Sequence, residues 1–281
     1  MSFLVTKADG TKEPFKVEKL RRSLRRSGAS KQEVAYVIDA ITKQLQDGML
    51  TQEIYRKAFE ILHHQELPAA ARYSLRRALF GLGPTGFPFE AFLARLFETE
   101  GYQTRLNITL EGKCATHEID IGAFKPEHSF VAEAKFHSRP GLKSDLQVSM
   151  YSYARLLDLK EQRICRADVC GIDEFWLITN TKFTSSAIRY GECVGLTMLS
   201  WNYPRRNNLH DRIQRAGIYP VTVLQNLSRK QALTLIEREV LICRDIRDQP
   251  FVLKYLNLSD KQMAVVMKEV ESLIGSAENT Q

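Results

Sequence analysis

The stretch "SFVAEAKFH", residues 129–137, constrains the fold of this chain more than any other. Side chains of a strand alternate between two faces. One face of this predicted strand is apolar and carries Phe130, Ala132, Ala134 and Phe136. The other carries Val131, Glu133, Lys135 and His137. Because an unpaired buried charge is costly, the second face must meet water, a counter-charge or a metal. Decoration of an edge strand is the simpler alternative for a Glu-x-Lys pair alone.

A second acidic strand precedes this one. In "HEIDIGAF" Glu118 and Asp120 share one face, and the turn "KPEHS" lets the two strands pair. Asp120 and Glu133 can then meet at the strand ends. Two converging carboxylates suit Mg²⁺ (or Mn²⁺), with water and phosphate oxygens completing the coordination. Lys135 beside them can orient a water and neutralise charge that develops on phosphorus.

Gly and Pro divide the 281 residues into three blocks. "GLGPTGFP" at 81–88 reads as a linker, and "AGIYP" at 216–220 ends a second block. We therefore expect domains at 1–83, 84–218 and 219–281. The middle block reads as helix, antiparallel strands, helix, strand, helix, strand, which predicts an α/β (α+β) fold with a mixed sheet flanked by helices.

The two outer blocks are predicted to be mostly helical. The first begins with a hairpin at Asp9-Gly10 and has a capping box at Ser30. In the last block, Ser228 and Ser259 are expected to cap helices, and the polar tail after Ile274 to be disordered. Its predicted buried residues are Leu233, Leu235, Ile236, Leu256 and Val266.

The basic excess is concentrated at the N-terminus. The net charge is +7, and residues 1–83 hold 15 basic and 9 acidic residues. Such an excess suits a polyphosphate ligand or nucleic acid, although a solvated helix face at "RRSLRR" (21–26) alone could supply it. Residues 219–281 hold 8 of each sign, so we expect them to pack on the middle block or a second subunit.

Composition excludes several classes of protein. Five cysteines form no CxxC pair, which argues against a zinc ribbon or disulfide framework. No run of 18 apolar residues and no secretory signal profile is present. A cytoplasmic protein with no membrane partner is the expectation.

The middle block resembles the PD-(D/E)xK nuclease superfamily, most closely its Mrr-like restriction endonuclease branch. The resemblance rests on "FPFEAFLARLFETEGY", "EIDI", "EAKFH" and "ITNTKFTSSAIRYGECVGLTMLSW". It implies a metal-dependent deoxyribonuclease with Asp120, Glu133 and Lys135 as catalytic residues, the two acids binding the metal and Glu90 near it. The proline of the family motif is absent, since Glu118-Ile119 precedes Asp120.

Gln147 and Tyr151 lie four residues apart and match the Q-x-x-x-Y of exonuclease-type members. They could hold a DNA phosphate or the catalytic water, and an ordinary helix surface is an equal alternative. His117 and His137 flank the acidic strands as further substrate-contact candidates.

The first block resembles the ATP-cone, a nucleotide-binding module of ribonucleotide reductases and their repressor. The matching stretches are "LVTKADGTKEPFKVEKLRRSLRRSG" and "LTQEIYRKAFEIL". The resemblance places an ATP or dATP ligand on Val5, Lys7, Glu13, Lys16, Lys19, Thr51 and Tyr55, although Lys16 and Tyr55 depart from the expected residue types. No GxxxxGK[ST] is present, so binding would be regulatory.

The sequence therefore predicts a Mg²⁺-dependent DNA endonuclease that a nucleoside triphosphate regulates, in restriction or defence. A nucleotide-responsive DNA-binding regulator without cleavage is the alternative. RNA as substrate, a homo-oligomer, the target sequence and the direction of the nucleotide effect all stay open.

Overall fold

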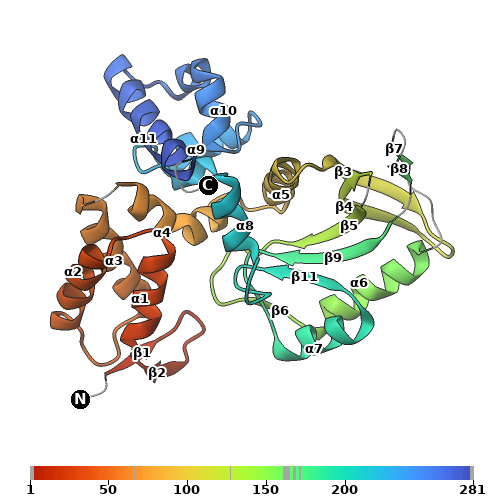
Figure 1. Cartoon of the computed structure of the whole chain (residues 1–281), viewed down its shortest axis with the longest axis horizontal. Helices are drawn as coiled ribbons and strands as arrows, with labels where there is room; N and C mark the ends of the chain where they lie inside the picture. The colour runs from red at the N-terminus through yellow and green to blue at the C-terminus, as the bar shows by residue number, and fades with distance from the viewer. Residues whose placement is uncertain are drawn as a thin grey trace. The chain divides into compact units, whose positions relative to one another are not determined.

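The computed structural model describes residues 3–65, 67–126, 128–160, 165–166, 169–170 and 172–278. Contacts divide the chain into two compact units (Figure 1). The first joins Met1–Gly81 with Tyr219–Gln281, and the second is Leu82–Ile218. None of the described helices is long and apolar enough to cross a membrane.

The first unit begins with a short hairpin, whose strands β1 (Leu4–Thr6) and β2 (Lys12–Pro14) are antiparallel. Gly10 turns the chain at φ +80°, a conformation that glycine adopts without strain. Four helices follow: α1 (Val17–Arg26), α2 (Lys31–Lys43), α3 (Thr51–Gln65) and α4 (Leu67–Phe80). The hairpin turn and the capping box of Ser30 with Glu33 are confirmed.

Contacts group the C-terminal segment with residues 1–81 in this same unit. It comprises η1 (Val221–Val223), α9 (Arg229–Ile236), α10 (Cys243–Asp248), η2 (Pro250–Leu256) and α11 (Asp260–Glu278). Its packing partner is α4 of the first block, whereas the sequence analysis expected the middle block or a second subunit.

The composition of α4 explains why the C-terminal segment packs on this helix. Small and apolar side chains occur on more than one side of this helix, and Ala71, Leu75 and Leu79 are fully buried. A helix that is apolar around much of its circumference needs covering from more than one direction. The hydroxyl of Thr222 donates to the backbone oxygen of Ala78 at 2.7 Å, which fixes η1 on α4.

Most local predictions for the C-terminal segment are confirmed. Ser228 and Ser259 each accept the backbone N–H three residues on, as expected of N-caps. Four of the five residues predicted to be buried are buried, and the fifth, Leu233, is half-buried. The predicted disordered tail is wrong for residues 275–278, which continue α11, and residues 279–281 lie outside the described ranges.

A five-stranded mixed sheet forms the centre of the second unit, as predicted. Its order is β11 (Thr197–Ser200), β9 (Glu174–Thr179), β5 (His128–Lys135), β4 (Thr116–Lys125) and β3 (Gln103–Glu111). β3, β4 and β5 pair antiparallel, whereas β5, β9 and β11 pair parallel. Two small pairs were not anticipated: β6 (Lys143–Ser144) with β10 (Lys182–Phe183), and β7 (Cys165–Arg166) with β8 (Val169–Cys170).

Helices cover both faces of this sheet (Figure 1). α5 (Phe87–Thr99) and α8 (Leu209–Ala216) lie on one face, where the ring of Phe97 packs edge-on at 4.9 Å from Phe130 and 5.7 Å from Trp176. α6 (Leu146–Leu159) and α7 (Ser185–Val194) cover the other face.

The position of β5 decides between the two explanations of its charges. It is the middle strand of the five, and residues 129–134 are all buried. Decoration of an edge strand is therefore excluded. Glu133 is only 4% exposed, so its charge requires partners inside the protein.

Candidate functional site

The pairing of β4 with β5 ends just where the acidic residues begin. Ile121 and Ala132 form the last paired positions, one residue short of Asp120 and Glu133. The Asp120 carboxylate accepts the backbone N–H of Ala134 at 2.7 Å. A side chain thus occupies the place that a main-chain acceptor would take, and the two acids are held together at the end of the ladder.

Glu133 is held by two cationic groups. Lys135 Nζ lies 2.5 Å from its Oε1, and the Arg155 guanidinium contacts its Oε2. Arg155 comes from α6, is 7% exposed, and also donates to the backbone oxygen of Glu118. Both oxygens of the buried carboxylate are therefore satisfied, as a charge in this environment requires.

Glu90 and Asp120 form the less compensated part of the cluster. Glu90 lies in the first turn of α5, next to Phe89, whose ring packs 5.6 Å from that of Phe136. Burial, with the nearby charges of Asp120 and Glu133, raises the pKa of Glu90 to about 7. Burial and the charge of Glu133 raise the pKa of Asp120 to about 6. The structure thus brings Glu90, Asp120, Glu133 and Lys135 into one electrostatic cluster.

A divalent cation suits this cluster in part. Crowded carboxyl groups with raised pKa values become easier to ionise when a cation lies between them. Glu90 and Asp120 fit that requirement, whereas Glu133 already has Lys135 and Arg155 as partners. Within the described ranges, no set of three or more His, Cys, Asp or Glu side chains is arranged to hold a metal ion.

Sequence reasoning missed Arg155. It follows Gln147 and Tyr151 at the same four-residue spacing, so all three lie on one face of α6. The guanidinium lies over the Tyr151 ring, 5.6 Å from its centroid. Extending the Q-x-x-x-Y spacing by one helical turn would have placed Arg155 on this face of the helix, but not its contact with Glu133.

Gln147 is exposed and borders a groove of about 650 Å³. The groove is lined by Asp145, Leu146, Gln147, Met150, Tyr151, Thr184 and Ser186. Among the described contacts, none joins Gln147 to Asp120 or Glu133, so its catalytic role stays a prediction. Tyr151 links the groove to the carboxylates through its contact with Arg155.

The two flanking histidines make structural contacts. His137 Nε2 lies 3.2 Å from Ser144 Oγ, and its backbone is hydrogen-bonded to the Asn180 side chain. His117 Nε2 lies 2.7 Å from Asp158 Oδ2. Asp158 also accepts the backbone N–H groups of Cys114 and Ala115, and so joins the β3–β4 turn to the end of α6.

This turn contact predicts a pH dependence of stability. The hydrogen bond from His117 lowers the pKa of Asp158 to about 2, from an ordinary value of 3.8. A carboxyl group with a lowered pKa stabilises the fold above its unfolded pKa and loses that contribution as the pH falls toward 2. We expect Asp158→Asn to lower stability at pH 7 and to flatten the change between pH 4 and pH 2. Urea midpoints measured against pH test this, and parallel curves for both proteins would contradict it.

In the N-terminal block three predicted ligand contacts form one cluster. Glu13 bridges Lys7 and Lys19, with an O–N distance of 2.8 Å to each. The hydrogen bonds from Lys19 and Lys7 lower the pKa of Glu13 to about 2. All three side chains are partly exposed, so both ammonium groups remain accessible to a phosphate.

The other predicted ligand residues are in varied surroundings. Val5 is 3% exposed and lies in the hydrophobic core, so its side chain packs inside the block. Lys16 is exposed at the N-cap of α1, and Thr51 begins α3 beside the hairpin, where Leu50 pairs with Thr6. Tyr55 stacks on Tyr73 at 4.8 Å and donates to its backbone oxygen.

Comparison with known proteins defines the class of this N-terminal block. Residues 3–79 match the ATP cone domain family, so the chain carries an ATP cone domain at its N-terminus. Residues 219–274 match the family described as AF1548-like, C-terminal.

An uncharacterized protein of Archaeoglobus fulgidus is 32% identical over 184 residues, which span 65% of this chain and all of that protein. The crystal structure of AF1548, a protein of unknown function, aligns with a TM-score of 0.55 and 30% identity, over 68% of this chain and all of that one. The chain therefore belongs to the AF1548-like family. Neither relative's description states an activity.

The cone predicts stabilisation by nucleotide. Because a ligand that binds only the native state stabilises it by mass action, ATP or dATP at a hundredfold excess over its Kd should add about 2.7 kcal/mol. Lys7→Ala with Lys19→Ala should abolish the rise in melting temperature. The full chain is the right material, since η1 and α11 of the C-terminal segment pack on α4.

Lys43→Ala with Lys57→Ala is the matched control, because both lysines lie on the same block away from Glu13. An equal thermal shift in wild type and in the Lys7, Lys19 variant would show that the nucleotide does not use this cluster.

Proposed function

We propose that this protein is a Mg²⁺-dependent DNA endonuclease that ATP or dATP regulates through the cone. The observation that carries the proposal is the cluster of Glu90, Asp120, Glu133 and Lys135 where the β4–β5 ladder ends. Acidic groups whose pKa values are strongly shifted by burial and by one another are typical of catalytic sites. The strand order β3-β4-β5-β9-β11, with helices on both faces, also supports the resemblance to PD-(D/E)xK nucleases.

Each side chain of the cluster has a distinct role in the proposal. Asp120 and Glu133 would hold the ion, with Glu90 near it, and a bound Mg²⁺ would supply charge stabilisation at the phosphate. Lys135 lies at the edge of the cluster and is partly exposed, where its ammonium group can orient an attacking water. Arg155 neutralises Glu133 from within and keeps its carboxylate in place.

Cleavage of supercoiled plasmid with Mg²⁺, with and without ATP and dATP, tests the proposal. Wild type should nick or linearise the plasmid, and Lys135→Ala should not. Lys143→Ala, an exposed lysine of the same unit, is the matched control. Equal cleavage by wild type and Lys135→Ala would assign the activity to a contaminant or to another site.

One observation favours a nucleotide-responsive DNA-binding regulator without cleavage. Both oxygens of Glu133 are already held by cations, an arrangement that is complete without a metal. DNA binding that responds to ATP, with no cleavage under any divalent ion, would support this second candidate. A restriction or defence role belongs to the first candidate only.

A further inference from the structure

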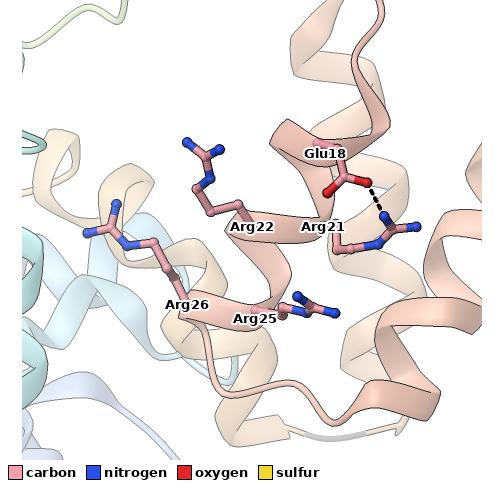
Figure 2. Close-up of a pocket in the computed structure, with 5 residues that line it drawn as sticks. All are labelled: Glu18, Arg21, Arg22, Arg25 and Arg26. Carbon is pink, nitrogen blue, oxygen red and sulfur yellow. Dashed lines mark hydrogen bonds and ion pairs between the residues drawn. The ribbon is translucent and has the colours of Figure 1, made fainter.

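A concentration of positive charge lies on helix α1, outside the candidate nuclease site. Arg21, Arg22, Arg25 and Arg26 follow one another over its last two turns and line a surface pocket of about 280 Å³ together with Glu18. Figure 2 shows that Arg22 and Arg26 extend to one side of the helix and Arg21 and Arg25 to the other. We call these four residues the arginine surface.

Two of the four arginines, Arg22 and Arg25, have no acidic partner among the described residues. Glu18 is the acidic residue that lines the pocket, and it pairs with Arg21 (Figure 2). No described residue forms an ion pair with Arg22 or Arg25, and both side chains are exposed. The charges of Arg22 and Arg25 therefore stay open to solvent.

Helix stability does not explain this arrangement. Basic residues in the last turn favour the helix because they face its negative end, which accounts for Arg25 and Arg26. Arg21 and Arg22 lie a turn earlier. Like charges four residues apart repel, so the 21–25 and 22–26 pairs weaken the helix. A feature that costs stability locally is expected where function requires it.

The helix holds the arginine surface in a fixed position. Leu20 and Leu24 are the buried side chains of α1, on the face of the helix turned away from the four arginines. After the helix, Gly28 adopts φ +83°, and the Arg72 Nε donates to the backbone oxygen of Ser27 at 2.7 Å. The backbone under the four arginines is thus anchored at its last turn.

We propose that the arginine surface binds the phosphate backbone of duplex DNA. Guanidinium groups form paired hydrogen bonds with phosphate oxygens, and their charge releases counterions from the duplex. Two pairs of cations on a rigid helix suit a repeating polyanion better than a single small anion, which two or three of these groups would saturate. The inference rests on the proposed function in one respect, that the protein acts on DNA.

The test is the salt dependence of binding to a fluorescein-labelled 20-base-pair duplex, measured with the full chain in EDTA so that no cleavage is required. We expect Arg22→Ala with Arg25→Ala to weaken binding on the order of tenfold and to reduce the slope of log K against log salt by about 2. Alanine favours helix, so the fold should be kept, which the melting temperature checks.

Arg229→Ala with Lys230→Ala is the control, because it removes the same charge from exposed positions on α9. Equal weakening by both double variants, or unchanged binding by the α1 variant, would overturn the inference. So would displacement of the duplex by poly-glutamate at equal charge, which would assign an acidic protein partner. Loss of the ATP-induced thermal shift in the α1 variant would assign the arginines to the nucleotide and overturn it as well.

The two proposals can fail separately. If Lys135→Ala abolishes cleavage and the α1 variant binds duplex normally, the nuclease proposal stands and the proposal that the arginine surface binds DNA is wrong. If no cleavage occurs and the α1 variant still loses its salt-dependent binding, the proposal for the arginine surface stands and the nuclease proposal is wrong.

Discussion

Asp120→Asn should reduce plasmid cleavage by about a thousandfold or more without lowering the melting temperature, since losing a charged metal ligand removes on the order of 4 kcal/mol of transition-state stabilisation. The choice of asparagine follows from the structure. Its amide oxygen can still accept the Ala134 N–H that Asp120 accepts at 2.7 Å, so the end of the β4–β5 ladder is retained while the charge is lost.

The chain offers a close control for this variant. Asp173 accepts the backbone N–H of Ser129 at 2.7 Å, the same contact at the other end of β5. Asp173→Asn should cleave like wild type. Cleavage by Asp120→Asn within a few-fold of Asp173→Asn would contradict the assignment of Asp120 to the site.

Glu133→Leu should destabilise the second unit by about 3–5 kcal/mol, because it leaves the Arg155 charge buried without its partner. Glu133 is therefore a poor choice for testing catalysis alone, since loss of activity in its variants would include loss of fold. Adding Arg155→Met to Glu133→Leu should restore much of the stability, since the pair would then be replaced by apolar side chains.

Urea denaturation of the two single variants and the double variant measures this coupling. Arg189→Met, on the exposed side of α7, should change stability by less than about 0.5 kcal/mol and serves as the control. Strictly additive effects of Glu133→Leu and Arg155→Met would show that the contact between the two side chains contributes nothing.

Local structure in this protein is determined by short stretches of sequence. The Asp9-Gly10 turn and the caps at Ser30, Ser228 and Ser259 depend on neighbours a few residues away. The mixed sheet could also be predicted from the order of strands and helices in the sequence. Antiparallel strands joined by tight turns and parallel strands joined by helices leave few other arrangements.

Tertiary structure alone decided the partners of buried groups. Arg155 reaches Glu133 across 22 residues, and nothing in the local pattern of α6 required a buried guanidinium there. His117 faces Asp158, 41 residues away, instead of the acidic cluster. Residues 219–278 pack on α4 because that helix has apolar surface left over after the cone core forms. Which apolar surfaces and charged groups become partners depends on the whole chain, because the native contacts are those that give the lowest total free energy.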